Sequence, residues 1–183
     1  MGDPKKSKKM YSRPKARWSL ERIQSEKEIV KTYGLVKKKE LWRMESIVRD
    51  LKRRARALLG EKNEVDEKVL INKVIIMGIS EQKGKVTVDD LLDLKVESVL
   101  DRRLQTIVYK SGLANTMKQA RQFIVHGHIL VDGIKSSSPG RLIKVEDEGK
   151  VSFAESSSLN ASFVKAEKSD SLKKPLKEEV EAA

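Results

Sequence analysis

The side chains of this sequence that could do chemistry are mainly cations, and the densest group falls within residues 46–60. This segment has five basic residues and a single acid, Asp50. Its basic residues are Arg49, Lys52, Arg53, Arg54 and Arg56. A guanidinium fork matches the geometry of a phosphate group, and the acids at helical spacing that would balance these charges are missing. The segment therefore predicts a contact with nucleic-acid phosphates, the alternative being a solvated helix face.

A second group of polar side chains falls within residues 116–133, TMKQARQFIVHGHILVDG. Thr116 and Gln119 have the spacing of a capping box, which satisfies two amides at the start of a helix. That helix would have one apolar face, with its cations on the other sides. Asp132 and Gly133 are a strong hairpin signal. The pattern predicts a capped helix, a tight turn and a strand that hold cations beside a hairpin.

The remaining polar residues form no catalytic constellation. Asp89, Asp90 and Asp93 are interpreted as acids at a helix start, where they suit the helix dipole. The sequence shows no Gly-rich phosphate loop, no plausible catalytic triad and no ligand cluster at metal spacing. It has no cysteine and only two histidines, which excludes disulfides and thiolate metal sites. We therefore expect no enzymatic activity, no cofactor, no metal and no small-molecule substrate.

Charge is the most unusual property of the composition. Lysine and arginine number 39 against 27 acids, so the formal net charge is +12. Residues 1–60 contain 19 basic and 7 acidic side chains, and residues 101–144 contain 8 and 2. Such basic regions are typical of proteins that bind a polyanion. No apolar run approaches the ~20 residues of a membrane span, and the N-terminus lacks a secretory h-region, so we expect an intracellular protein without a membrane partner.

Residues 1–18 predict a basic extended arm, because two prolines and little apolar content argue against a packed element. Its basic residues are Lys5, Lys6, Lys8, Lys9, Arg13, Lys15 and Arg17. The arm is either a solvated tail or a segment that becomes ordered on RNA. Tyr11 and Trp18 could stack on bases or dock on the protein.

Apolar spacing predicts a series of helices after the arm. The predicted ranges are 19–33, 38–59, 64–77, 88–94 and 96–110. Gly60 is expected to end the second helix. Leu20 is expected to share one helix face with Ile23, Val30 and Tyr33, and Val65 and Val69 are assigned to the core. After the motif helix, residues 128–131, 141–145 and 150–154 are predicted to be strands.

These elements predict an α+β fold. Residues 19–100 would form a mostly helical N-terminal domain. Residues 101–155 would form a small module in which a helical pair packs on a short antiparallel β-sheet. Residues 156–183 are predicted to be a mostly disordered tail, because they have few apolar anchors.

The sequence QAR-x-x-I-x-HGHI-x-VDG, starting at Gln119, resembles the core of the RNA-binding module named after ribosomal protein S-four. The family commonly has Asn in place of Asp132, and both residues suit the turn. The resemblance extends over residues 100–145, from LDRRLQTIVYKSGLA to RLIKV. It departs after Pro139, where Gly-Arg replaces the common Ser-Tyr pair. This S-four module (residues 101–155) implies RNA binding and nothing finer, because it also occurs appended to pseudouridine synthases and tyrosyl-tRNA synthetases.

The N-terminal region narrows the resemblance. GDPK, YGL-x-x-KKELWRMES and RRARALLG are similar to the N-terminal domain of the archaeal and eukaryotic type of the S-four ribosomal protein family. Bacterial members often carry a cysteine zinc site, which this chain cannot form. The resemblance, over about residues 1–155, implies a structural constituent of the small ribosomal subunit in the cytoplasm. Such proteins bind small-subunit ribosomal RNA early in assembly at a multi-helix junction, neighbour other small-subunit ribosomal proteins, and influence translational accuracy near the messenger entry.

On the family's pattern, the module presents a set of cations and polar side chains to RNA. The residues expected to do so are Arg102, Arg103, Lys110, Lys118, Arg121, Gln122, His126, His128 and Lys135. Cations contact phosphates and release counterions, and Gln and His can reach sugar hydroxyls. For Arg121 the alternative is an ion pair within the module, and for His126 a structural role at a helix end. The alternative function is a free-standing RNA chaperone or stress factor that carries the same module.

Overall fold

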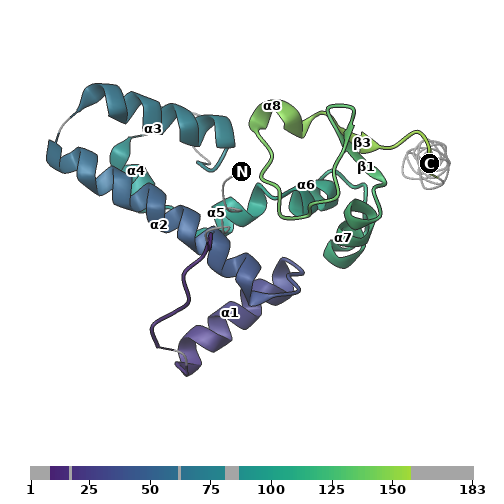
Figure 1. Cartoon of the computed structure of the whole chain (residues 1–183), viewed down its shortest axis with the longest axis horizontal. Helices are drawn as coiled ribbons and strands as arrows, with labels where there is room; N and C mark the ends of the chain where they lie inside the picture. The colour runs from purple at the N-terminus through teal and green to yellow at the C-terminus, as the bar shows by residue number, and fades with distance from the viewer. Residues whose placement is uncertain (1–8, 17, 62, 81–86, 158–183) are drawn as a thin grey trace, which may run out of the picture.

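The structure is a computed structural model that describes residues 9–16, 18–61, 63–80 and 87–157. The N-terminal part contains α1 (Leu20–Thr32), α2 (Lys38–Glu61), α3 (Glu64–Met77), α4 (Val88–Leu92) and α5 (Val96–Asp101). The S-four module adds α6 (Leu104–Lys110), α7 (Met117–Val125), β1 (Ile129–Val131), β2 (Ile134–Lys135), α8 (Val145–Glu148) and β3 (Val151–Phe153). The long helices and the sheet module occupy opposite ends of the molecule (Figure 1). The predicted fold class, mostly helical with a small antiparallel sheet, is confirmed.

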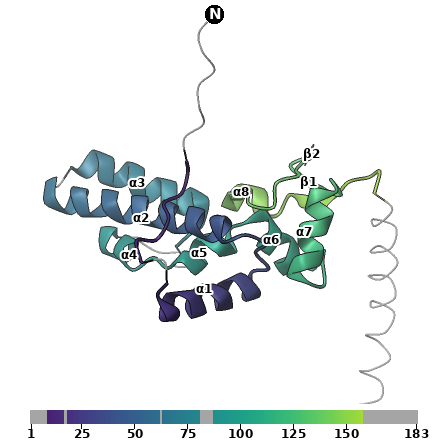
Figure 2. The same ribbon diagram turned by 60° about the horizontal axis from the view of Figure 1, so that its bottom comes forward.

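Helix α2 organises the N-terminal part and packs against α1, α3, α4 and α5. Leu41, Met44, Val48 and Leu51 recur three and four residues apart along it and are buried, as an amphipathic core helix requires. Figure 2 shows α1 on one side of α2 and α3 on the other. The expected end at Gly60 is wrong, because α2 continues to Glu61. A glycine in a helix costs roughly 1 kcal/mol relative to alanine but does not break it.

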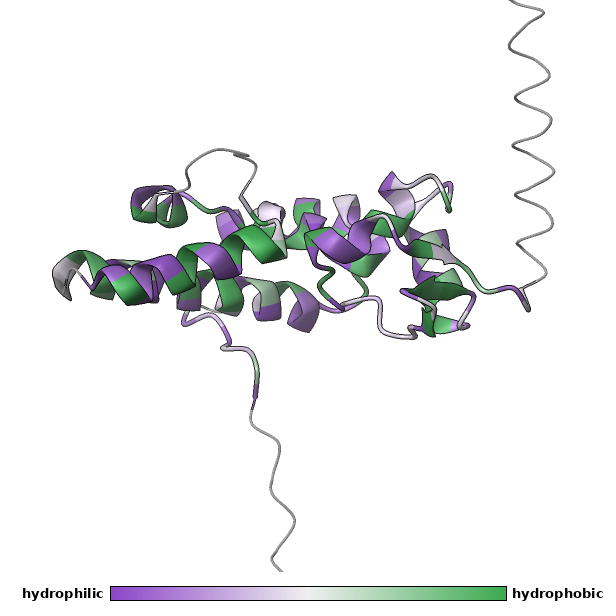
Figure 3. Cartoon of the chain, turned by 90° about the horizontal axis from the view of Figure 1, so that it is seen from above, coloured by the Kyte–Doolittle hydropathy of each residue, from purple (hydrophilic) through white to green (hydrophobic). Residues whose placement is uncertain are grey.

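Two residues assigned to the core from the sequence lie at the surface instead. Val65 is 70% exposed and Val69 63%, and Leu20, on the predicted apolar face of the first helix, is 73% exposed. In α3 only the face that carries Leu70 and Val74 is buried. In Figure 3 hydrophobic and hydrophilic residues alternate along the helices, as expected where one face is covered. The apolar spacing in α3 runs around the whole helix, so the pattern alone could not show which face is covered.

The predicted single helix over residues 96–110 is two helices, α5 and α6, with a break between them at Arg102 and Arg103. The Leu104 amide donates to the Arg141 carbonyl (2.8 Å). The Ile143 amide donates to the Arg102 carbonyl (2.9 Å). Backbone bonds from residues 141–143 thus replace helical ones. The strand predicted at residues 141–145 is correspondingly reduced to a single bridge, and α8 begins at its end.

The sheet has the order β2-β1-β3 and is antiparallel. Val131 pairs with Ile134 across the predicted hairpin. Asp132 (φ 54°) and Gly133 (φ 75°) both have positive φ, which a two-residue type I′ turn requires. Ile129 pairs with Phe153 on the other side of β1. The hairpin and the strand predicted near residues 150–154 are therefore confirmed.

The buried apolar residues form two separate clusters. The first runs from Leu35 to Leu100 and belongs to the N-terminal helices. The second runs from Leu104 to Phe153 and belongs to the module. Their boundary coincides with the break between α5 and α6, and Leu142 of the module packs against the first cluster. Among the described residues, no helix has the length and apolar character to cross a membrane.

Candidate nucleic-acid interface

The basic stripe of α2 lies at the surface. Arg49, Arg53, Arg54 and Arg56 are exposed and Lys52 is half-buried. An ion pair in this stripe joins Arg53 Nη2 to Asp50 Oδ1 at 3.5 Å, with both side chains well exposed. Such exposed pairs stabilise a protein by at most about 1 kcal/mol. The guanidinium groups are therefore accessible to an external anion.

Part of this stripe borders a groove between α2 and the α4–α5 corner. Arg49, Lys52 and Arg56 line this groove of about 500 Å³, and its opposite wall contributes Asp93 and Glu97. Those carboxylates weaken the positive field on that side of the stripe. Arg53 is not part of the lining. The more favourable approach for a polyanion is accordingly over the Arg53 side of α2.

The described part of the N-terminal arm lies along α2. The Ser12 amide donates to Ser46 Oγ at 3.3 Å, and the Arg49 guanidinium donates to the Ser12 hydroxyl. The Tyr11 ring lies 6.1 Å from the Trp42 ring. Tyr11 therefore docks on the protein, which decides between its two predicted roles.

Trp18 is 87% exposed and remains available for stacking. Lys9, Arg13 and Lys15 of the arm are exposed. The other predicted arm residues fall outside the described part of the chain; they are Lys5, Lys6, Lys8 and Arg17.

Helix α7 presents a second polar surface. Its start is capped as predicted, since the Gln119 amide donates to Thr116 Oγ1 at 3.2 Å. The Gln119 side chain reaches one residue further back than expected and accepts from the Asn115 amide at 2.9 Å. Lys118 and Gln122 are exposed on this helix. The cap therefore fixes where α7 begins and which residues face outward.

The other polar residues predicted in the module occupy less uniform positions. His126 and Lys135 are exposed. His128 is half-buried, with its Nδ1 3.0 Å from Ser157 Oγ. Lys110 lies 3.3 Å from Asp101 but keeps 54% of its side chain exposed. All but His128 are accessible without rearrangement.

The two arginines at the α5–α6 break do not lie on an open surface. Arg102 is 12% exposed in its side chain and donates to Glu148 at 2.7 Å. Arg103 is 1% exposed and donates to Glu40 Oε2 at 2.7 Å. Burial lowers the pKa of the Arg103 guanidinium, and the Glu40 carboxylate opposes this effect. In this conformation both guanidinium groups are paired within the protein, and their role as RNA contacts stays a prediction.

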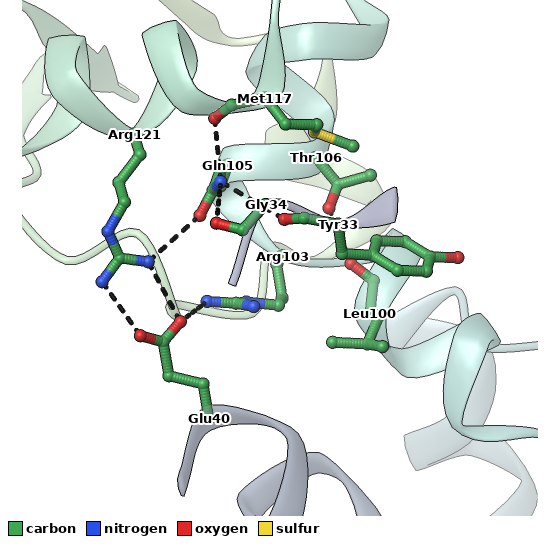
Figure 4. Close-up of polar contacts among 9 residues, drawn as sticks. All are labelled: Tyr33, Gly34, Glu40, Leu100, Arg103, Gln105, Thr106, Met117 and Arg121. Atoms are coloured by element: carbon green, nitrogen blue, oxygen red, sulfur yellow. Dashed lines mark hydrogen bonds and ion pairs between the residues drawn. The ribbon is translucent and has the colours of Figure 1, made fainter. Parts of the chain in front are cut away.

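Arg121 is also engaged inside the protein (Figure 4). Its Nη2 donates to Glu40 Oε1 at 2.9 Å and its Nη1 to Glu40 Oε2 at 3.0 Å. Its side chain is 24% exposed. An ion pair was the predicted alternative for Arg121, but the partner lies on α2 and not within the module. Glu40, Arg103 and Arg121 are called the Glu40 cluster below.

The sequence resembles known families over nearly its whole length. The S4 domain family matches residues 102–148. The small ribosomal subunit protein uS4 of Saccharolobus islandicus is 45% identical over 164 residues, covering 88% of this chain and 90% of that protein. The uS4 protein of Methanococcus aeolicus is 43% identical over 178 residues, covering 94% and 98%. The uS4 protein of Hyperthermus butylicus is 47% identical over 160 residues, covering 86% and 90%.

The chain belongs to the uS4 family of small ribosomal subunit proteins. This confirms the resemblance inferred from the motifs, and it places the chain among ribosomal structural proteins and not among enzymes. Because the similarity to the Methanococcus aeolicus uS4 covers 94% of the chain, it includes α2 as well as the module. The region of similarity to uS4 proteins therefore includes both polar surfaces, the stripe of α2 and the exposed face of α7.

Sequence reasoning missed one residue of this uS4 chain that the structure makes central, Glu40. It is the lone acid after three consecutive lysines, Lys37, Lys38 and Lys39. A single acid directly after a run of lysines can indicate that its carboxylate has a specific cationic partner. The sequence contained that signal, but nothing local indicated that two arginines more than sixty residues away supply the partners.

Proposed function

We propose that this chain is a structural constituent of the small ribosomal subunit that binds small-subunit ribosomal RNA directly. The observation that carries this proposal is the exposed arginine stripe of α2, in which five basic residues are accompanied by one acid, Asp50, within residues 46–60. Guanidinium groups bind phosphate oxygens in a bidentate manner. The relatives are named as small ribosomal subunit proteins, which supports ribosomal RNA as the polyanion.

The proposal includes a multi-helix junction as the binding site. The stripe of α2 and the exposed face of α7 belong to different parts of the molecule, so each can engage a separate RNA helix. Two linked contacts raise affinity because the second becomes intramolecular. Binding that needs no other protein would occur early in assembly. A position beside neighbouring ribosomal proteins would let the chain influence translational accuracy. In cells that carry variants with weakened RNA binding, a stop-codon readthrough reporter would detect a change in accuracy.

The test is binding of the full chain to a deproteinised small-subunit RNA junction fragment and to a generic RNA duplex of equal length, over a salt series. We expect the junction to bind ~100-fold more tightly than the duplex, within the usual range of specificity ratios. The variants Arg53→Ala/Arg56→Ala and Lys118→Ala/Gln122→Ala should each weaken junction binding. Each lost phosphate contact should lower the salt slope by about 0.7 to 0.9.

The matched control is Lys27→Ala/Lys31→Ala, which removes two exposed cations of α1. If this control weakens binding as much as the stripe variant does, the charge acts only as a general polyanion surface. Equal affinity for junction and duplex would favour the RNA chaperone instead.

A further inference from the structure

Buried and half-buried polar groups meet at the seam between the N-terminal helices and the S-four module. Gln105 of the module donates its side-chain amide to the Met117 carbonyl within the module at 2.8 Å. It also lies within hydrogen-bond distance of the Tyr33 and Gly34 carbonyls, at 3.4 and 3.3 Å. Gln105 is 1% exposed. Hydrogen bonds are directional, so this seam fixes an orientation more sharply than apolar contact would.

One carboxylate accepts from two arginines at this seam. Glu40 receives three hydrogen bonds of 2.7 to 3.0 Å from Arg103 and Arg121. Figure 4 shows both guanidinium groups converging on it from the module side. The Arg121 contact is bidentate, which adds geometric specificity to the interaction. The cluster therefore restricts rotation of the module relative to α2.

The Glu40 cluster also joins the two helices that carry the candidate RNA surfaces. Glu40 lies in the first turn of α2, and Arg53 of the stripe follows 13 residues later, about 20 Å along the helix axis. Arg121 lies on α7 between the exposed Lys118 and Gln122. A single set of ion pairs thus connects both surfaces through rigid helices.

We propose that Glu40 is a positioning residue for RNA binding, which holds the α2 stripe and the α7 face at one separation and so selects an RNA junction over a single RNA helix. This inference rests on the proposed function, in which both surfaces bind RNA. Glu40 acts through Arg103 and Arg121 and does not itself contact RNA. Without it, the two surfaces move relative to each other, and the second RNA contact loses the advantage of being intramolecular.

The test uses the full chain with Glu40→Gln, which keeps the side-chain shape and removes the charge. Dissociation constants are measured over a salt series for the junction fragment and for a single hairpin taken from it. We expect the junction to bind roughly tenfold or more weakly, a fraction of the gain that linked contacts provide. The hairpin, which occupies one surface, should keep its affinity within about twofold. The salt slope of junction binding should fall toward that of the hairpin.

The control for the change in net charge is Glu28→Gln on α1, an exposed acid, which should leave the ratio of the two affinities unchanged. Gln105→Leu loosens the same seam without changing charge. It should shift the ratio in the same direction, and it decides the question if Glu40→Gln fails to fold by circular dichroism.

Equal losses on both RNAs in a folded variant, or no loss on either, would overturn the inference. A wild-type chain that does not prefer the junction would instead overturn the proposed function.

Discussion

Two carboxylates of this chain are held in their ionised form by neighbouring cations. Burial raises the pKa of Glu40, but hydrogen bonds from Arg121 and Arg103 outweigh it, so the pKa lies below its ordinary value. Burial likewise raises the pKa of Glu26, and the hydrogen bond from Lys38 contributes most to reversing that effect. Opposite charge within hydrogen-bond distance favours the ionised form. Both acids therefore link folding to pH.

The sign of this linkage follows from the depressed pKa values. A carboxyl whose pKa is lower in the folded state stabilises the protein above its unfolded pKa, and loses that contribution as pH falls through the folded pKa. We expect the free energy of unfolding to decrease as pH falls below about 4.5, the ordinary value for these groups. Urea unfolding between pH 7 and pH 3 measures it.

Glu40→Gln should flatten this pH dependence, whereas Glu28→Gln should leave it unchanged. A Glu40→Gln variant with the wild-type pH profile would contradict the role assigned to these ion pairs.

At the scale of secondary-structure elements, the end of α3 is fixed by one glycine. Gly78 has φ +63°, and its amide donates to the Ile75 carbonyl at 2.9 Å. A Cβ added there would lie 2.6 Å from Val145 Cγ2 and 3.0 Å from Arg102 Cζ. The position thus requires both a left-handed backbone and close approach to α8. At Gly78 the last turn of α3 therefore packs directly against the module.

Gly78→Ala should destabilise the protein by about 1–3 kcal/mol, because it combines a positive φ with steric overlap. The matched substitution is Gly60→Ala in α2, where a Cβ meets nothing within 4 Å. It should stabilise the chain by about 0.5–1 kcal/mol. Thermal or urea unfolding compares the two variants. Equal effects of the same sign would show that local backbone geometry does not govern either position.

For the molecule as a whole, two apolar clusters and an uneven charge distribution define the architecture. The helical cluster and the module cluster meet at a seam that the hydrogen bonds of Glu40 with Arg103 and Arg121 cross. Positive charge is concentrated in the first sixty residues, which have 19 basic and 7 acidic side chains. Residues 158–183 contain five of each and add no net charge. The electrostatic part of RNA binding should therefore originate from the N-terminal third and the module.

Deleting residues 158–183 should leave the salt slope of junction binding unchanged, because the segment has no net charge. Deleting residues 1–8 removes three basic side chains, Lys5, Lys6 and Lys8, partly offset by Asp3, and should lower the slope wherever these lysines contact phosphates. Salt titration of both truncated chains against the same RNA measures the difference. A lower slope after the C-terminal deletion would place RNA contacts in that segment.

Much of the fold was predictable where the stabilising contacts are local. The bounds predicted for residues 64–77 match α3, and the Asp132-Gly133 hairpin forms as expected. Exposed positions were harder to predict. Val65 and Val69 are apolar yet exposed, because which helix face is covered depends on neighbouring helices and not on the period of the sequence.

The sequence by itself determined the helix periods, the cap of α7, the hairpin and the basic stripe of α2, because these depend on residues close together in the chain. Only the tertiary structure showed the partners of Arg103 and Arg121 within the chain. An arginine has the same chemistry whether it binds a phosphate or a carboxylate. Its role depends on whether folding brings an acid to it, and here Glu40 comes from another helix, 63 and 81 residues away along the chain.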